Sequence, residues 1–183
     1  MAREVFGSRE LVSALSGALD LPDVVALRTA GGFCSLPVWE AILQRGADVY
    51  ICGGSNGCAA LASVERFGRE QRRWEAVPPM LQPRLGAVGV AIAGRLYVCG
   101  GCDGAPAAGG AGNLRSAERF DPGANKWEAL PDMLERRRHA VGAALGGRLY
   151  ACGGEGGCDG EYVLSSAERF DPASGSWEAL PPM

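Results

Sequence analysis

The spacing of hydrophobic residues changes near residue 46. Upstream, apolar positions recur at i, i+4, i+7 and i+8 after Ser8, which is the spacing of one helical face. A second helix is predicted to begin near Pro22, which is suited to a first helical turn, and to end at Gly31-Gly32. A third helix is predicted to begin at Ser35-Leu36-Pro37. Three short amphipathic helices are therefore predicted within residues 1–45, with apolar positions at Leu11, Val12, Leu15, Ala18 and Leu19, then Val24, Val25 and Leu27, then Val38, Trp39, Ile42 and Leu43.

Downstream, short runs of β-branched, aromatic and apolar residues end at turn-forming glycine or proline, which predicts strands. Four kinds of strand recur, which we call a, b, c and d. Strand a consists of small apolar residues, and strand b ends in a cysteine before a Gly doublet. Strand c ends in Glu-Arg-Phe, and strand d begins at a Trp and ends before a Pro. Their copies are Val49–Cys52, Arg95–Cys99 and Arg148–Cys152 for b; Ser63–Phe67, Ser116–Phe120 and Ser166–Phe170 for c; Trp74, Trp127 and Trp177 onward for d; Ala87–Ile92 and Ala140–Leu145 for a.

These strands recur with a period of roughly 50 residues, which marks a repeat architecture. The Trp follows the Phe of strand c by seven residues in all three copies, and the Gly doublet follows the Trp by 27 residues in both cases where this can be counted. A repeated four-stranded antiparallel unit is a propeller blade, and the small residues of strand a suit the crowded position next to the axis. The sequence contains three copies of strands b, c and d but two copies of strand a. It therefore predicts a partial propeller.

The repeats resemble kelch repeats in the Gly doublet, the Tyr of strand b, the Glu-x-Phe of strand c, the Trp of strand d and the Arg that opens strand a. The resemblance implies a β-propeller that serves mostly as a protein-binding platform. We therefore expect an all-β chain of kelch-type blades preceded by a short α-helical segment. Residues 1–45 form the helical segment and residues 46–183 form blades at about 46–80, 81–133 and 134–183.

Loop lengths point to a recognition face. The Gly doublet and the following Trp are separated by 20, 26 and 23 residues in the three copies, so all of the variation lies between strands b and c. Antiparallel alternation places the b–c and d–a loops on the same side of a blade, and repeat proteins vary their loops on the side that binds. The b–c loops contribute the candidate partner-binding residues Asn56, Asp103, Asn113, Glu155, Asp159 and Tyr162.

The d–a loops add positive charge to this predicted face, at Arg84, Arg136, Arg137, Arg138 and His139. Arginine can hold a partner's carboxylate or phosphate bidentately. The alternative is that Arg84 and Arg137, which are equivalent positions 53 residues apart, hydrogen-bond neighbouring loop carbonyls. Arg136 and Arg138 could equally be solvated, and a structural role is favoured for His139, which occupies a common kelch position.

Composition excludes several classes of partner and chemistry. A formal charge of −3 gives no reason to expect nucleic acid or an anionic membrane as partner. Seven cysteines without a secretory signal favour free thiols in a reducing compartment, hence the cytoplasm. Cys52, Cys99 and Cys152 share one repeat position in different blades, so they are expected to pack as small apolar groups and not to bind metal. One His and no nucleophile-elbow motif argue against an enzyme, and no cofactor is expected.

The first segment also resembles a degenerate F-box over residues 8–43, a module that recruits the adaptor subunit of a cullin ubiquitin ligase. Two interpretations stay open: substrate recognition for such a ligase, with the propeller choosing the substrate, or a helical cap on the first blade of a non-ligase scaffold, for example an actin-binding or other cytoskeletal protein. A partial propeller exposes blade edges, so self-association through them is also predicted.

Overall fold

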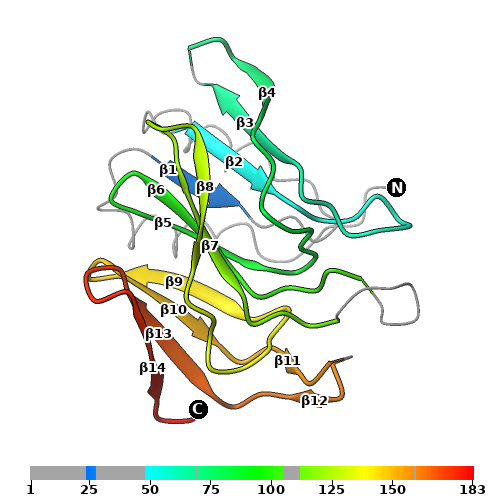
Figure 1. Cartoon of the computed structure of the whole chain (residues 1–183), viewed down its shortest axis with the longest axis vertical. Helices are drawn as coiled ribbons and strands as arrows, with labels where there is room; N and C mark the ends of the chain where they lie inside the picture. Colours follow the sequence, from blue (N-terminus) through cyan, green and yellow to red (C-terminus); the bar gives the residue numbers. More distant parts are fainter. Residues whose placement is uncertain (1–23, 28–47, 69, 105–111, 159) are drawn as a thin grey trace, which may run out of the picture.

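The computed structural model describes residues 24–27, 48–68, 70–104, 112–158 and 160–183. Within these ranges every regular element is a strand. The strands form three four-stranded sheets and one short hairpin, arranged one after another down the molecule (Figure 1). The described part of the chain is therefore all-β, as the repeats predict.

Each sheet is one blade. The first contains β1 (Val24–Leu27), β2 (Asp48–Cys52), β3 (Val64–Gly68) and β4 (Arg73–Val77). The second contains β5 (Val88–Ile92), β6 (Arg95–Cys99), β7 (Ala117–Asp121) and β8 (Lys126–Leu130). The third contains β9 (Val141–Leu145), β10 (Arg148–Cys152), β13 (Ala167–Asp171) and β14 (Ser176–Leu180), and β11 (Glu155–Gly156) pairs with β12 (Tyr162–Val163) in its b–c loop.

The repeated Phe and Trp set the register of each outer hairpin. Phe67 lies opposite Trp74, and the equivalent pairs of the second and third blades are also directly opposed. The three pairs of rings have centroids 5.4, 5.2 and 5.2 Å apart. The fixed spacing of seven residues is therefore the length of a tight hairpin that brings the two rings into contact.

One predicted helix is wrong. Val24–Leu27, expected within the second helix, is strand β1, which pairs in parallel with β2 from Val24 opposite Asp48 to Leu27 opposite Ile51. It occupies the inner position that strand a occupies in the other blades. Two β-branched residues in a short apolar run fit either element, and the inner edge of β2 has ladder groups that only a strand can satisfy. The other two predicted helices lie outside the described residues.

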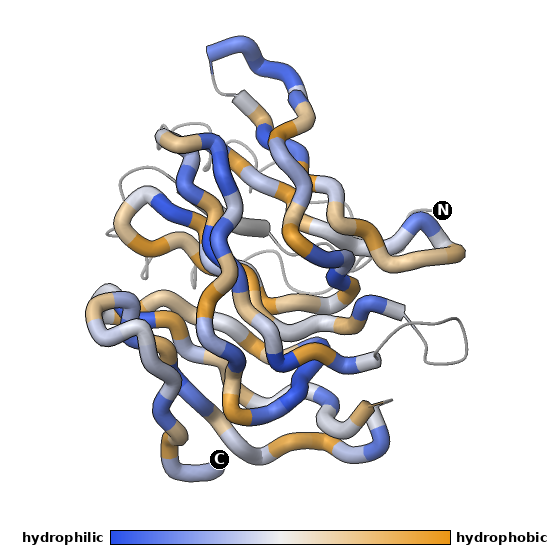
Figure 2. Tube along the Cα trace, viewed as in Figure 1, coloured by the Kyte–Doolittle hydropathy of each residue, from blue (hydrophilic) through white to orange (hydrophobic). Residues whose placement is uncertain are grey.

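The hydrophobic core lies between blades. One cluster joins the first and second blades around Tyr50, Phe120 and Trp127, and another joins the second and third around Tyr97 and Phe170. Hydrophobic positions follow the strands, whereas the β3–β4 turn at the top of the molecule is hydrophilic (Figure 2). Each blade thus buries its apolar surface mainly against its neighbours, as expected of a repeat array.

The Gly doublets allow the close approach of the next blade. A Cβ on Gly53 would lie 2.3 Å from the carbonyl oxygen of Arg84, and a Cβ on Gly100 would lie 2.4 Å from that of Arg137. Both glycines also have φ of 67°. No other residue could occupy these positions without moving the neighbouring backbone.

Candidate functional site

The loop face consists of the b–c loops (53–63, 100–116 and 153–166) and the d–a loops (78–87 and 131–140). The described parts of these loops, without residues 105–111 and 159, lie toward the right-hand side of Figure 1. The shared placement follows from the antiparallel order of strands β2 to β4, β5 to β8, and β9, β10, β13 and β14. The variable loops predicted from spacing alone therefore share one side of the molecule.

Arg84 and Arg137 hold this face together from within. Both side chains are 1 % exposed. Arg84 donates from Nε to Glu118 at 2.7 Å and from Nη1 to the carbonyl oxygen of Gly100 at 2.8 Å. Arg137 makes the same contacts with Glu168, at 3.0 Å, and with Gly153, at 2.8 Å.

This placement takes Arg84 and Arg137 out of the predicted contact surface. Their guanidinium groups are enclosed with a buried carboxylate and with loop carbonyls, which is the alternative role left open by the sequence. Each carboxylate also accepts a backbone N–H from the d–a loop, from Leu81 in one blade and Leu134 in the other, both at 2.7 Å. A buried charge needs such full pairing, and the result is a rigid joint between the two loops.

Asn113 is also structural. It is fully buried, and its Nδ2 donates to the carbonyl oxygen of Glu155 at 3.1 Å, which ties the second b–c loop to the third. Arg136 donates to the carbonyl oxygen of Asn113 at 2.8 Å. Asn56 is exposed and its Oδ1 accepts the amides of Cys58 and Ala59, so it shapes its own loop. Arg136 and Asn56 remain at the surface, whereas Asn113 does not.

Arg138, His139 and Glu155 form a charged cluster at the surface. Arg138 Nε donates to Glu155 Oε2 at 2.7 Å, and His139 Nδ1 lies 3.5 Å from Glu155 Oε1. The Arg138 guanidinium, with a smaller contribution from His139, lowers the pKa of the Glu155 carboxyl. His139 has φ of 54°, and its backbone N–H donates to Gly86 of the preceding d–a loop at 2.8 Å. This cluster presents polar groups of both signs to the solvent.

Apolar side chains are also exposed on the loop face. Tyr162, a predicted candidate, is 56 % exposed in β12, and its neighbour Val163 is 84 % exposed. Leu81 and Leu134 are 58 % and 53 % exposed. The sequence analysis missed Leu81 and Leu134, although both directly follow the repeated Met after strand d and lie 53 residues apart. Asp103 is half-buried, and Asp159 lies outside the described residues.

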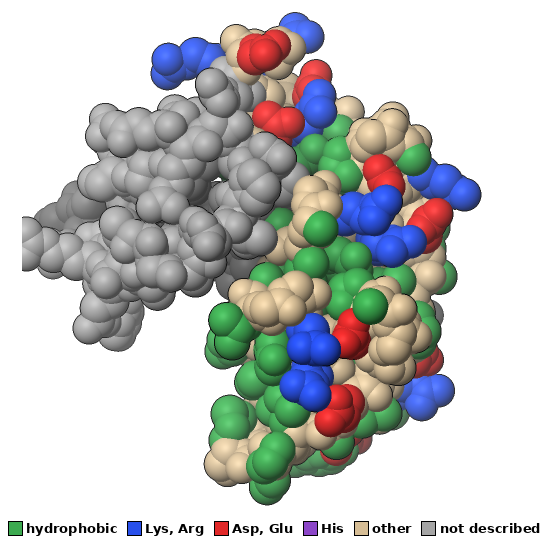
Figure 3. All heavy atoms as spheres, turned by 90° about the vertical axis from the view of Figure 1, so that its left-hand side faces the viewer, with side chains coloured by type: hydrophobic (Ala, Val, Ile, Leu, Met, Phe, Trp, Pro, Cys, Tyr) green, Lys and Arg blue, Asp and Glu red, His purple; other side chains and the backbone are tan. Residues whose placement is uncertain are grey.

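The opposite end of the blades carries paired charges. Arg95 donates to Asp121 at 2.9 Å in the second blade, and Arg148 donates to Asp171 at 2.8 Å in the third. Figure 3 faces this end and shows Lys and Arg side chains beside Asp and Glu side chains. Its basic groups are thus largely neutralised within the chain.

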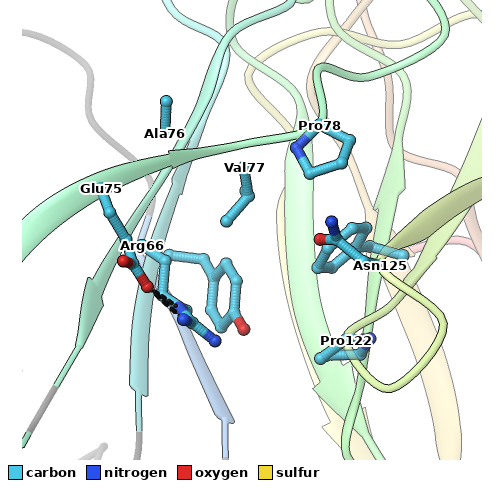
Figure 4. A pocket seen from close by; sticks show the side chains of 9 residues that line it. Arg66, Glu75, Ala76, Val77, Pro78, Pro122 and Asn125 are labelled. Atoms are coloured by element: carbon cyan, nitrogen blue, oxygen red, sulfur yellow. Dashed lines mark hydrogen bonds and ion pairs between the residues drawn. The ribbon is translucent and has the colours of Figure 1, made fainter.

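A cleft of about 340 Å³ lies between the first two blades. Arg66 and Glu75 stand on one wall, and Pro122 and Asn125 of the c–d turn stand on the other (Figure 4). Arg66 Nε donates to Glu75 at 2.9 Å and lies near Asp48, so the cleft offers no uncompensated charge among its described residues. It therefore makes a weak case for a ligand site.

The described residues show neither a metal cluster nor a membrane segment. No group of three His, Cys, Asp or Glu side chains among them is placed to hold a metal ion, and none of them forms a long apolar helix that could cross a membrane. Cys99 is fully buried, and burial raises the pKa of its thiol to about 12. It packs as a small apolar group.

Comparisons with known proteins agree with the blade architecture. The Kelch motif matches residues 46–81, 83–134 and 136–183. Human Kelch-like protein 33 is 36 % identical over 115 residues, covering 61 % of this chain and 20 % of that protein. An Arabidopsis thaliana protein, F-box/kelch-repeat protein At5g03020, is 30 % identical over 94 residues, covering 51 % of this chain and 26 % of that protein.

Among solved structures, the one titled "Structure of YjhT" matches with a TM-score of 0.59 at 16 % identity, over 72 % of this chain and 51 % of that chain. This likeness concerns the fold. The chain spans only about a fifth to a quarter of the length of the two relatives named above.

Proposed function

The chain belongs to the kelch-repeat family, and on that premise we propose that its blades bind a protein partner through the loop face. The family and its relatives favour a protein-interaction module over an enzyme. The observation that carries the proposal is the set of exposed apolar side chains on this face, of which Tyr162 and Val163 protrude on the β11–β12 hairpin.

The chemistry of the loop face fits a protein surface. An aromatic ring with a polar tip can be an interface anchor, because it buries a large area at a small entropic cost. Around it, Arg138, Glu155 and His139 offer donors and an acceptor at 28 to 42 % exposure. Such a polar rim around apolar anchors is the usual composition of a specific interface. The net charge of −3 favours a protein over nucleic acid.

Substitution on the loop face tests this proposal. Tyr162→Ala, combined with Val163→Ala, removes two side chains that contribute little to the folded chain because both are exposed. The matched control is Lys126→Ala, an exposed side chain at the c–d turn of the second blade. Partners retained by the unmodified chain in quantitative affinity capture should be lost with the first variant and kept with the control. Loss with Lys126→Ala alone would place the binding site at the other end of the blades.

A finer proposal is that the chain is the substrate-recognition subunit of a cullin-type ubiquitin ligase in the cytoplasm. Its support is the F-box resemblance of residues 8–43 and the similarity to a protein named as an F-box/kelch-repeat protein. Most of this segment lies outside the described residues, and Val24–Leu27 is a strand of the first blade. The propeller would then choose the substrate, and the preceding segment would hold the adaptor.

The position of β1 dictates how the ligase proposal is tested. Deletion of the whole segment would remove β1 and uncover the inner edge of β2. We therefore suggest Leu15→Asp with Leu19→Asp, upstream of β1, and expect loss of the cullin adaptor with other partners retained. Capture of the same partners by both forms, with no ligase subunit, would instead favour the alternative, a non-ligase scaffold that binds actin or another cytoskeletal protein.

A further inference from the structure

Buried charges hold the backbone of Leu81 and Leu134 in place. The amide of Leu81 donates to Glu118 and the amide of Leu134 donates to Glu168, both at 2.7 Å. Both carboxylates are 1 % exposed. Each leucine therefore has an ordered backbone, although it lies in a d–a loop.

The side chains of the two leucines point into the solvent. Leu81 is 58 % exposed and Leu134 is 53 % exposed, whereas the methionines that precede them, Met80 and Met133, are buried. Leu81 lies at the junction of the first and second blades, and Leu134 lies at the junction of the second and third. An apolar side chain on an ordered backbone loses less conformational freedom when a partner covers it. The two leucines are thus preorganised apolar contacts, one blade apart.

An exposed carboxylate lies beside the second leucine. Glu135 is 47 % exposed, and its Oε2 accepts from Arg137 Nη2 at 3.3 Å and from Ser166 Oγ. Its Oε1 has no hydrogen-bond partner among the described residues. Arg137 is already paired with the buried Glu168 at 2.8 Å. Glu135 therefore adds a negative charge to the surface that the neighbouring arginine does not balance.

The first leucine has no such charge beside it. Gln82 occupies the position equivalent to the exposed carboxylate, and its Nε2 donates to Ser116 Oγ. Asp132, close to the second leucine in sequence, is neutralised by Arg115 at 2.9 Å. The two d–a loops therefore present two apolar side chains and, next to one of them, a carboxylate oxygen that can accept a hydrogen bond.

This arrangement fits a protein segment of particular chemistry. We propose that the d–a loops bind a segment of a partner protein that packs apolar side chains on Leu81 and Leu134 and places a Lys or Arg beside Glu135. The basic side chain donates a charge-assisted hydrogen bond to Glu135 Oε1, and the apolar side chains remove the leucines from water. An acidic segment is repelled at the same point. This inference rests on the proposal that the loop face binds a protein, and it names the chemistry of the partner.

Selection of displayed peptides on the whole 183-residue chain tests this chemistry. A random peptide library is selected on the unmodified chain, and the selected peptides should carry Lys or Arg next to apolar residues. The double variant Leu81→Ser with Leu134→Ser should bind these peptides at least about a hundredfold less tightly, because two apolar contacts are lost. A separate selection on Glu135→Lys should return peptides with Asp or Glu in place of Lys or Arg.

Two controls accompany the selection. Glu70→Lys makes the same change of charge at an exposed glutamate of the β3–β4 turn, at the other end of the blades, and should leave the selected peptides unchanged. Circular dichroism and melting should show that the double serine variant is folded, because both leucine side chains are exposed.

The outcomes separate this inference from the proposed function. Peptides that bind equally well to the double serine variant and to Glu135→Lys would overturn the inference, and so would a selection that returns no binding peptide. If the selected peptides require Tyr162 and Val163 instead, the loop face still binds protein and only the proposed chemistry of the segment is wrong. If they require neither pair of side chains, the proposed function fails as well. Basic peptides returned by Glu135→Lys would show that Glu135 does not select the charge of the partner.

Discussion

Glu118→Gln is expected to destabilise the second blade through one buried ion pair. Glu118 is 1 % exposed, and its two oxygens accept Arg84 Nε and the amide of Leu81, both at 2.7 Å. The amide that replaces it has the same shape but no charge, and one of its two ends is a donor. The NH₂ end of the glutamine amide would face an N–H group that needs an acceptor. Arg84 would remain buried without a carboxylate to balance its charge.

The magnitude follows from the burial of both partners. Breaking a buried pair by removing one charge costs about 3–5 kcal/mol, because the remaining charge stays desolvated. Arg84 also donates to the carbonyl oxygens of Gly100 and Ser116, which stabilise its charge in part. We therefore expect the lower end of this range, about 3 kcal/mol, in the free energy of unfolding.

The chain offers its own control for this change. Glu65 is the equivalent residue of the first blade, is exposed, and forms no ion pair with a described residue. Glu65→Gln should change the free energy of unfolding by less than about 0.5 kcal/mol. Urea titration followed by circular dichroism gives both values. If Glu118→Gln and Glu65→Gln destabilised the chain equally, the buried pair would contribute nothing measurable and the reasoning would be refuted.

Three further predictions concern the blades. Gly100→Ala should lower the free energy of unfolding by about 2 kcal/mol more than Gly146→Ala does. Both glycines have positive φ, but only a Cβ at Gly100 would meet the neighbouring backbone. A thiol reagent at neutral pH should modify the exposed Cys158 and spare the buried Cys99, as mass spectrometry of peptides would show; equal labelling would contradict the core placement. The Arg95 side chain and two backbone amides lower the pKa of Asp121, so the contribution of this carboxylate to stability is complete above the ordinary carboxyl pKa of about 4 and is lost as the pH falls through the lowered value. The melting temperature of Asp121→Asn should therefore fall less steeply over that pH window than the melting temperature of the unmodified chain. A parallel fall of the two would refute this.

The sequence predicted the repeated part of the fold because each blade is specified locally. The Phe and Trp seven residues apart define the outer hairpin, and the Gly doublet marks the end of strand b. Strand β1 could not be predicted in this way. Val24–Leu27 has no repeat partner in the sequence, and its conformation depends on pairing with β2, some twenty residues further on.

The loop face was predicted in position but not in detail. Spacing identified the b–c and d–a loops, and Tyr162 is exposed as a contact residue must be. Arg84 and Arg137 are charged residues in loops, and composition alone cannot separate a solvated arginine from one enclosed by Glu118 or Glu168. Leu81 and Leu134 were missed because the candidates chosen from these loops were polar, charged or aromatic residues, and aliphatic side chains were not considered.

The parallel pairing of β1 has a consequence for the order of folding. The second and third blades consist of neighbouring strands joined by turns and loops, so their contacts link residues close in sequence and should form early. The first sheet is complete only when β1 pairs with β2, and residues 28–47 separate the two strands in the sequence. Bringing the two strands together costs conformational entropy before any hydrogen bond between them has formed. Pulsed hydrogen exchange should therefore find the amides of β2 that face β1 to be the last in the blades to gain protection.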